Sequence, residues 1–177
     1  MKFVFDKAKC LPFTLTLGII ALDQLVKLFI VKNWPEGTFI KDLFDNDLVR
    51  FIHVRNKAIA FSLGQNLPEF LRTPFFVILP IVVLGLLLWY YFKTPSLCTS
   101  HRWAIAGIVG GGIGNIIDRI FRPDGVVDYV SVKFFGIFGW DYWPTFNIAD
   151  ASVVISCLIL LAVMIFGPKT EEENEVS

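Results

Sequence analysis

The sequence predicts an all-α integral membrane protein: a bundle of four transmembrane helices with a small β-structure in its first long loop. Three observations support this fold class. Apolar residues make up 55% of the 177 residues and charged residues only 18%, and the mean hydropathy of +0.62 exceeds what a soluble domain needs. Four apolar segments are each long enough to cross a bilayer, which takes roughly 20 residues. Aromatic residues reach 15%, which is typical of lipid contact and interfacial belts.

The predicted spans cover residues 11–31, 74–92, 103–121 and 148–166. The first span resembles a secretory signal peptide, but it continues into polar residues without a small-residue cleavage site, so we expect it to be retained. Charged residues just before Cys10 likewise argue against a lipoprotein cysteine. The third span carries glycines spaced by four, Gly107 with Gly111 and Gly110 with Gly114, which predict close packing against other helices.

The loop of residues 32–73 is too long for a simple connector. Residues 48–54 predict a strand, residues 58–63 are expected to pair with it, and residues 68–72 are expected to form a short interfacial helix. Residues 122–146 are predicted to be a loop in which Trp140, Tyr142 and Trp143 suit a membrane–water boundary. We expect residues 1–170 to form one membrane-embedded domain and residues 171–177 to form a disordered acidic tail.

Polar residues of different spans are expected to meet at one end of the bundle. Successive helices run in opposite directions, so the second half of the first span, the end of the third and the start of the fourth lie near the same face. An ionisable residue inside a membrane costs a few kcal/mol, so each needs a partner or a purpose. The residues in question are Asp23, Lys27, Asn115, Asp118, Arg119, Asn147 and Asp150, with Asp128 in the adjoining loop.

Ion pairing separates these residues by role. Asp23 and Lys27 are four residues apart and can pair on one helix face. Asp118 is expected to stay ionised beside Arg119. We interpret both pairs as structural rather than as the site of chemistry.

The remaining carboxylates, Asp128 and Asp150, can form a dyad if they face each other. Two carboxylates a few ångström apart cannot both ionise easily, so one keeps a proton near neutral pH. The ionised group can then take a proton from water, while the protonated group hydrogen-bonds a scissile carbonyl, as in an aspartic protease. From spacing alone, however, membrane aspartates mark proton relays and transport pathways at least as often.

Composition excludes several other classes of site. The formal net charge is zero, so no nucleic-acid partner is indicated. We expect no metal and no cofactor, because the chain has only two histidines, no H-E-x-x-H motif and no clustered Cys and His. Three widely spaced cysteines do not form a disulfide framework.

Five short motifs, in order and over nearly the whole chain, resemble the bacterial lipoprotein signal peptidase (signal peptidase II) family. They are D-x-x-x-K at residues 23–27, the N-x-G-A-A-F-S-like segment at residues 56–62, G-N-x-x-D-R at residues 114–119, V-V-D-[FY] at residues 126–129 and F-N-x-A-D at residues 146–150. Two residues depart from the family pattern: Ala58 and Ile59 stand where it usually has Gly and Ala. Their bulk is expected to narrow the pocket or stiffen the loop.

The resemblance implies an aspartic endopeptidase of the bacterial cytoplasmic membrane. It would remove signal peptides from diacylglyceryl-modified prolipoproteins, cutting before the lipidated cysteine, and a globomycin-type cyclic peptide would occupy the same pocket. Both termini would be cytoplasmic, the site would lie near the outer face among membrane lipids, and the first long loop would form an extracytoplasmic β-cradle. The resemblance assigns catalysis to Asp128 and Asp150, pocket lining to Asn56, Asn115, Arg119 and Asn147, and support to Asp23, Lys27 and Asp118.

Two other function classes stay open on the residues alone. One is a small proton-coupled transporter or channel that uses Asp23, Asp118 and Asp150 as a relay. The other is a non-catalytic membrane assembly factor, whose function would survive the loss of both aspartates of the dyad. We expect a monomer, because one chain supplies both carboxylates.

Overall fold

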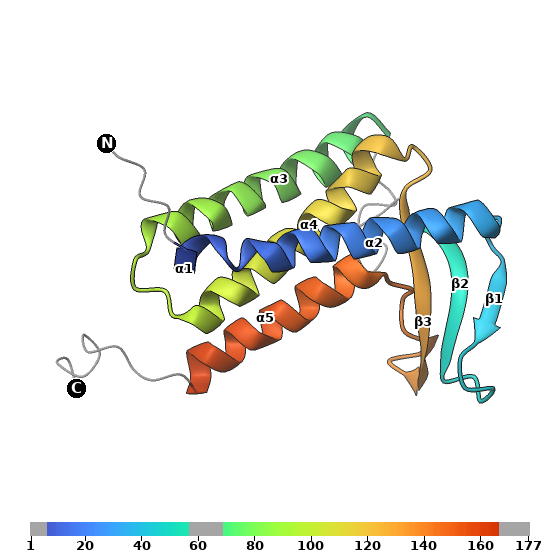
Figure 1. Cartoon of the computed structure of the whole chain (residues 1–177). Helices are drawn as coiled ribbons and strands as arrows, with labels where there is room; N and C mark the ends of the chain where they lie inside the picture. Colours follow the sequence, from blue (N-terminus) through green and yellow to red (C-terminus); the bar gives the residue numbers. More distant parts are fainter. Residues whose placement is uncertain (1–6, 57–68, 167–177) are drawn as a thin grey trace.

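Four long helices lie side by side in the computed structural model, and a small antiparallel sheet lies at one end of them (Figure 1). The structure describes residues 7–56 and 69–166. Within this part, four helices are long and apolar enough to cross a membrane, as the sequence predicts, although the second and third begin earlier than expected. The helices are α1 (Lys7–Cys10), α2 (Phe13–Asn33), α3 (Glu69–Lys93), α4 (Thr99–Phe121) and α5 (Ile148–Phe166).

The central helix of the bundle is α4, which contacts α2, α3 and α5. Its glycines allow the neighbours to approach closely. A Cβ atom at Gly111 would lie 2.3 Å from the carbonyl oxygen of Ala149 in α5, and one at Gly110 would lie 3.1 Å from the Cα of Thr16 in α2. The hydroxyl of Thr16 donates a hydrogen bond of 2.7 Å to the carbonyl oxygen of Ala106. The glycine pattern therefore seats α2 and α5 directly on α4, as predicted.

The outer surfaces of α2, α3 and α5 expose large apolar side chains. Leu17, Leu86 and Leu158 are 68%, 62% and 60% exposed. Exposure of this kind is unfavourable in water over so large an area, whereas hydrocarbon solvates it well. These three helices therefore present the lipid-facing surface of the protein.

The sheet combines strands from both long loops, in the order β1-β2-β3-β4 with every neighbour antiparallel. The predicted first strand is confirmed in β2, but the interpretation of residues 122–146 as a loop is wrong. That segment forms the 12-residue strand β3, rich in valine and phenylalanine, together with β4. Its partner β2 lies far away in the chain, which is why local signals failed to reveal it. The strands are β1 (Phe39–Asp42), β2 (Val49–Asn56), β3 (Val126–Ile137) and β4 (Trp140–Tyr142).

Residues 58–63, expected as a partner strand, and the tail of residues 171–177 lie outside the described residues. So do Ala58 and Ile59, the two departures from the family pattern. The short helix expected at residues 68–72 is instead the first part of the continuous helix α3, from Glu69 onward.

The sheet packs against the end of α2. Ile30 of α2 forms a buried cluster with Val127 and Tyr129 of β3, and Val26 and Trp34 pack around it. In Figure 1 the start of α1 and the end of α5 lie at the opposite end of the bundle. The sheet therefore stands beside the helix ends where polar residues of α2, α4 and α5 were predicted to meet.

Candidate active site

A buried ion cluster centred on Lys27 joins α2 to α4. The ammonium Nζ lies 2.8 Å from Asp23 Oδ2 and 3.0 Å from Asp118 Oδ2, and the three side chains are fully buried. Nζ also donates a hydrogen bond of 3.0 Å to Asn115 Oδ1. Each of the three ammonium protons thus has an acceptor, which a buried cation requires. The predicted pair of Asp23 and Lys27 is present.

In the described part of the chain no salt bridge joins Asp118 to Arg119, although the charge of Asp118 does act on the Arg119 guanidinium. Among the described residues, the cations bridged to Asp118 are Lys27 and Arg122. Successive residues of a helix point in different directions, whereas residues four apart share a face, so Arg122 reaches the carboxylate and Arg119 is free to point elsewhere. Asp118 Oδ2 also accepts the backbone N–H of Val127 at 3.1 Å. This carboxylate therefore ties the end of α4 to the start of β3.

Two polar residues of this cluster were missed by the sequence analysis. Gln24 Nε2 donates to Asp118 Oδ1 and to the carbonyl oxygen of Gly114, both at 3.0 Å. Arg122 lies at the start of the segment predicted to be a loop. An amide beside a span aspartate, and an arginine four residues after Asp118, were the signals that could have identified them.

The first turn of α5 is fixed by a capping box. The backbone N–H of Asp150 donates to Asn147 Oδ1 at 2.9 Å, and the N–H of Asn147 donates to Asp150 Oδ2 at 3.1 Å. The first N–H of the helix donates to the hydroxyl of Tyr129 at 3.3 Å, and the second donates to Asp23 Oδ1 at 3.1 Å. Every N–H group of this turn thus has a side-chain acceptor, so Asp150 is held in a defined position.

Asn147 also joins Asp150 to Asp128. Its Nδ2 donates a hydrogen bond of 2.7 Å to Asp128 Oδ1, while its backbone N–H donates to Asp150. The remaining carboxylate oxygens accept from other amides: Asp128 Oδ2 from Asn56 at 3.0 Å, and Asp150 Oδ1 from Asn115 at 2.7 Å. Elements β2, β3, α4 and α5 therefore converge on one pair of carboxylates bridged by a single asparagine.

Asp128 lies on a strand and not in a loop as predicted. The register pairs Asn56 of β2 with Val126 of β3. Side chains two residues apart on a strand share a face, so Asn56 and Asp128 are diagonal neighbours on the sheet. Antiparallel strand pairing therefore fixes the position of the Asp128 carboxylate, and helix capping fixes that of Asp150.

Burial gives Asp128 an unusual electrostatic setting, since its side chain is only 2% exposed. Burial, and then the nearby charge of Asp150, raise the pKa of Asp128 to about 7, against the opposing hydrogen bonds from Asn56 and Asn147. The guanidinium of Arg119, half-buried at the end of α4, interacts electrostatically with Asp150 and Asp128. The pair can thus hold one proton near neutral pH beside a cation.

The described residues contain no group of three or more His, Cys, Asp or Glu side chains placed to hold a metal ion. What they do contain is a carboxylate pair with amide donors on its oxygens. Such a pair can take a proton from one atom and give a proton to another.

The fold and this cluster define a class: a multi-pass membrane protein with a buried acid–base pair at one end of its helical bundle. The chain belongs to the signal peptidase II family, because residues 15–166 match the family described as "Signal peptidase (SPase) II". That family makes the protein a protease, and the relatives similar to it are named accordingly.

A lipoprotein signal peptidase of Treponema pallidum is 43% identical over 172 residues, which cover 97% of this chain and 89% of the relative. One from Treponema denticola is 45% identical over 153 residues, covering 86% and 87% of the two chains. A solved structure described as a bacterial membrane enzyme is 25% identical, with a TM-score of 0.74 and 87% of each chain covered. A second such structure, 24% identical, has the same TM-score and covers 89% and 94%; it supports the fold alone.

Proposed function

We propose that this protein is an aspartic endopeptidase that removes signal peptides from diacylglyceryl-modified prolipoproteins by cutting just before the lipidated cysteine. The observation that carries this proposal is the bridge through Asn147, which holds Asp128 and Asp150 together at the boundary end of a membrane bundle. Membership of the signal peptidase II family supports the substrate class.

In the proposed reaction the two carboxylates divide acid and base work. Asp150 is the ionised member, since it lies in the first turn of α5, where the helix dipole favours an anion, and near the charge of Arg119. Asp128, with its pKa near 7, is the protonated member. Asp150 takes a proton from water as the water oxygen bonds to the scissile carbonyl carbon. The proton of Asp128 passes to the carbonyl oxygen, giving a tetrahedral diol.

Collapse of the diol completes the cycle. The carbon–nitrogen bond breaks, the proton held by Asp150 passes to the leaving amine, and a hydroxyl proton of the diol returns to Asp128. The pair ends with one proton, as it began, so no external acid or base is consumed.

Charge balance supports a single proton on the pair. The cluster holds three cations, Lys27, Arg119 and Arg122, and two paired anions, Asp23 and Asp118. A singly ionised dyad adds one negative charge, so cations and anions are then equal in number. A doubly ionised dyad would leave excess negative charge in a buried place, which is costly.

The supporting residues are proposed to position this dyad. Asn56, Asn115 and Asn147 hold the carboxylate oxygens through the hydrogen bonds described above. Asp23, Lys27 and Asp118 form a buried ion cluster. This cluster positions Asn115 through Lys27, and Asn115 in turn accepts a hydrogen bond from Asn147. In this scheme Asp23 and Asp118 are paired too tightly with Lys27 to serve as the proton relay considered earlier.

The same proposal covers substrate delivery and orientation. A diacylated cysteine and an apolar signal helix both lie in the bilayer, so a site beside lipid-facing helices receives them already positioned. We propose that both ends of the chain are cytoplasmic, that the sheet is an extracytoplasmic cradle, and that residues 1–170 act as one monomeric domain. A globomycin-type cyclic peptide is proposed to compete for the same pocket.

The activity is tested by mixing purified protein with a diacylglyceryl-modified prolipoprotein and, separately, with the unmodified precursor. We expect cleavage of the lipidated form only, a product whose first residue is the modified cysteine by mass spectrometry, and loss of cleavage with globomycin. Asp124→Asn, an exposed aspartate beyond the site, is the control and should cleave normally. Folded protein that leaves the lipidated precursor intact would contradict the proposal.

The orientation is tested by labelling intact cells and opened membranes with a membrane-impermeant maleimide. Single cysteines are placed at exposed Lys7, before α2, and at exposed Asp124, before β3, in a chain whose own cysteines are replaced by serine. We expect the cysteine at position 124 to react in intact cells and the one at position 7 to react only after opening. The reverse pattern would place the site on the cytoplasmic side.

A further inference from the structure

The sheet has two ends of different character. One end carries Asn56 and Asp128, and the other carries the turn between β1 and β2 and the turn between β3 and β4. The first of these turns lies against β3, because the N–H of Lys133 donates to the carbonyl oxygen of Leu48 at 2.8 Å. We call this second end the sheet tip; it comprises Leu43, Phe44, Leu48, Phe135, Ile137, Phe138 and Trp140.

The sheet tip exposes its apolar side chains. Phe44, Phe135 and Phe138 are 60%, 68% and 87% exposed, and the tip lies outside the membrane-spanning helices. Phe135 and Phe138 also have positive φ angles of 56° and 53°, a conformation that bulky residues rarely adopt. The fold therefore holds two aromatic rings outward at a backbone cost, on a face that water would disfavour.

Polar contacts join the turn between β1 and β2 to the hairpin of β3 and β4. Asp47 of the first turn accepts a hydrogen bond from the hydroxyl of Tyr142 in β4 and lies 3.4 Å from Lys133 Nζ. The guanidinium of Arg50 lies 3.4 Å from the centre of the Tyr142 ring and 3.5 Å from Asp47. Because of these contacts the apolar side chains of both turns are presented together.

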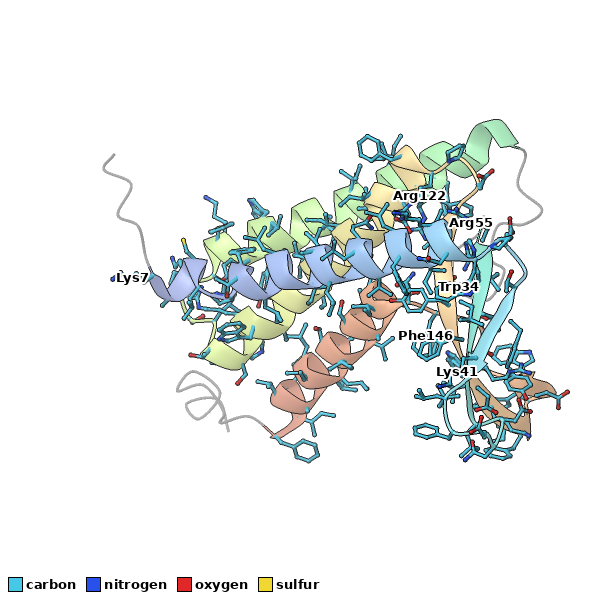
Figure 2. The ribbon with its side chains drawn as sticks, turned by 45° about the vertical axis from the view of Figure 1, so that its right-hand side comes forward. Lys7, Trp34, Lys41, Arg55, Arg122 and Phe146 are labelled. Atoms are coloured by element: carbon cyan, nitrogen blue, oxygen red, sulfur yellow. The ribbon has the colours of Figure 1, made fainter. Side chains whose placement is uncertain are left out.

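The position of the sheet brings the tip to the membrane boundary. β3 packs against Val26 and Ile30, which lie inside the membrane-spanning helix α2, so the sheet stands level with the last turns of that helix. The strands run across the helix axes, and the tip projects sideways from the bundle (Figure 1). Figure 2 shows Lys41 near the tip, with Arg55 and Arg122 toward the other end of the sheet.

We propose that the sheet tip inserts into the membrane–water interface on the side of the carboxylate pair, and that its partner is the lipid surface itself. Aromatic side chains favour this boundary. The contact is apolar rather than electrostatic, since the tip region has three basic and four acidic residues: Lys41, Arg50 and Lys133 against Asp42, Asp45, Asp47 and Asp141. Zwitterionic lipid is therefore a sufficient partner, and salt does not release the tip.

Insertion has a consequence that rests on the proposed function. β2 and β3 connect the tip to Asn56 and Asp128, so an anchored tip fixes the height of the carboxylate pair relative to the lipid layer. A diacylated substrate is held in that same layer. The anchored tip therefore sets the register, that is, the relative depth in the bilayer, of the scissile bond and the carboxylate pair.

Insertion is measured directly with spin labels on the full chain in phosphatidylcholine vesicles. In the serine-replaced background, one label is placed at Phe138→Cys and the matched control at Asp124→Cys, near the opposite end of β3. The label at 138 should collide more with oxygen, which dissolves in lipid, than with a water-soluble nickel chelate, and high salt should not change this. The control should show the reverse. A label at 138 accessible mainly to the nickel chelate, or shielded from both agents as by a protein partner, overturns the proposal.

The functional consequence is measured with the double variant Phe44→Ser and Phe138→Ser. In vesicles KM for the lipidated precursor should rise roughly tenfold with kcat unchanged, reflecting lost interfacial burial, and Phe138→Trp should keep the wild-type KM. Equal KM values for double variant and wild type contradict the register role. If wild-type protein cleaves nothing, the proposed function fails, while the label measurement still decides whether the tip is inserted.

Discussion

Each buried charge in the cluster around Lys27 has hydrogen-bond or salt-bridge partners. Lys27 has three acceptors for three ammonium protons, in a place where its side chain and those of Asp23 and Asp118 are fully buried. Such a cluster is stable only when every charge in it has a partner, because an unpaired charge in a low-dielectric interior is costly.

Replacing Lys27 with Met should therefore destabilise the protein strongly. The substitution leaves the buried carboxylate of Asp23 without its cation and leaves Asp118 with Arg122 alone, at a cost of about 3–5 kcal/mol. Thermal unfolding in detergent measures the effect, with Lys41→Met, an exposed lysine of β1, as the control. A second variant, Lys27→Met with Asp23→Asn, should recover part of the loss, because it removes the carboxylate left without its cation. If the Lys27 and Lys41 variants were equally stable, the ion cluster would not be what supports the carboxylate pair.

The pH dependence of cleavage follows from Asp128. Its pKa is raised to about 7 by burial and by the charge of Asp150, so its proton is present below that pH and lost above it. Cleavage should therefore fall as pH rises through about 7, and the apparent value belongs to the coupled pair. Initial rates on the lipidated precursor across this range provide the measurement. A rate that keeps rising well above neutrality would mean that no such proton is used.

At the scale of elements, α4 organises the bundle and α5 supplies one carboxylate. Gly111 lies against the first turn of α5, where a Cβ atom would be 2.3 Å from the carbonyl oxygen of Ala149 and 2.4 Å from Ser152 Oγ. Neither a backbone carbonyl nor the capped turn around it can move aside easily. The contact between these two helices therefore controls the position of Asp150.

Gly111→Ala should lower both stability and cleavage. Overpacking at this contact is expected to cost about 1–3 kcal/mol and to displace the start of α5. Gly18→Ala is the matched control, because a Cβ there would meet nothing within 4 Å; its stability should be unchanged or slightly higher. Thermal unfolding and cleavage rate, measured on both variants, test this. Equal behaviour of the two would contradict the close contact.

The predictability of these elements differed for a physical reason. Helix α4 and its glycine contacts could be predicted from the sequence, because glycines spaced by about four residues are visible within a short stretch of chain. Strand β3 could not, since it is stabilised by β2 from a distant loop. The arginine that forms a salt bridge with Asp118 is Arg122, four residues on, because helix geometry favours it over the sequence neighbour Arg119.

At the scale of the whole molecule, the convergence of polar residues was predictable from topology alone. Four alternating spans bring the end of α2, the end of α4 and the start of α5 to one end, and the structure places them there. What topology could not supply is the bridge: Asn147 contacts both carboxylates only because a helix cap and a strand meet at this point. The site therefore depends on the junction of bundle and sheet.

The central claim, that Asp128 and Asp150 act as one catalytic unit, is tested most directly by single-turnover cleavage. The rates compared are those of Asp128→Asn, Asp150→Asn and the double variant on the lipidated precursor. Each single variant should lose roughly a thousandfold or more, and the double variant should lose little beyond that, because members of a unit are not additive. Circular dichroism should show all three folded. A single variant that retains cleavage within about tenfold of wild type, or losses that multiply in the double variant, would contradict the account.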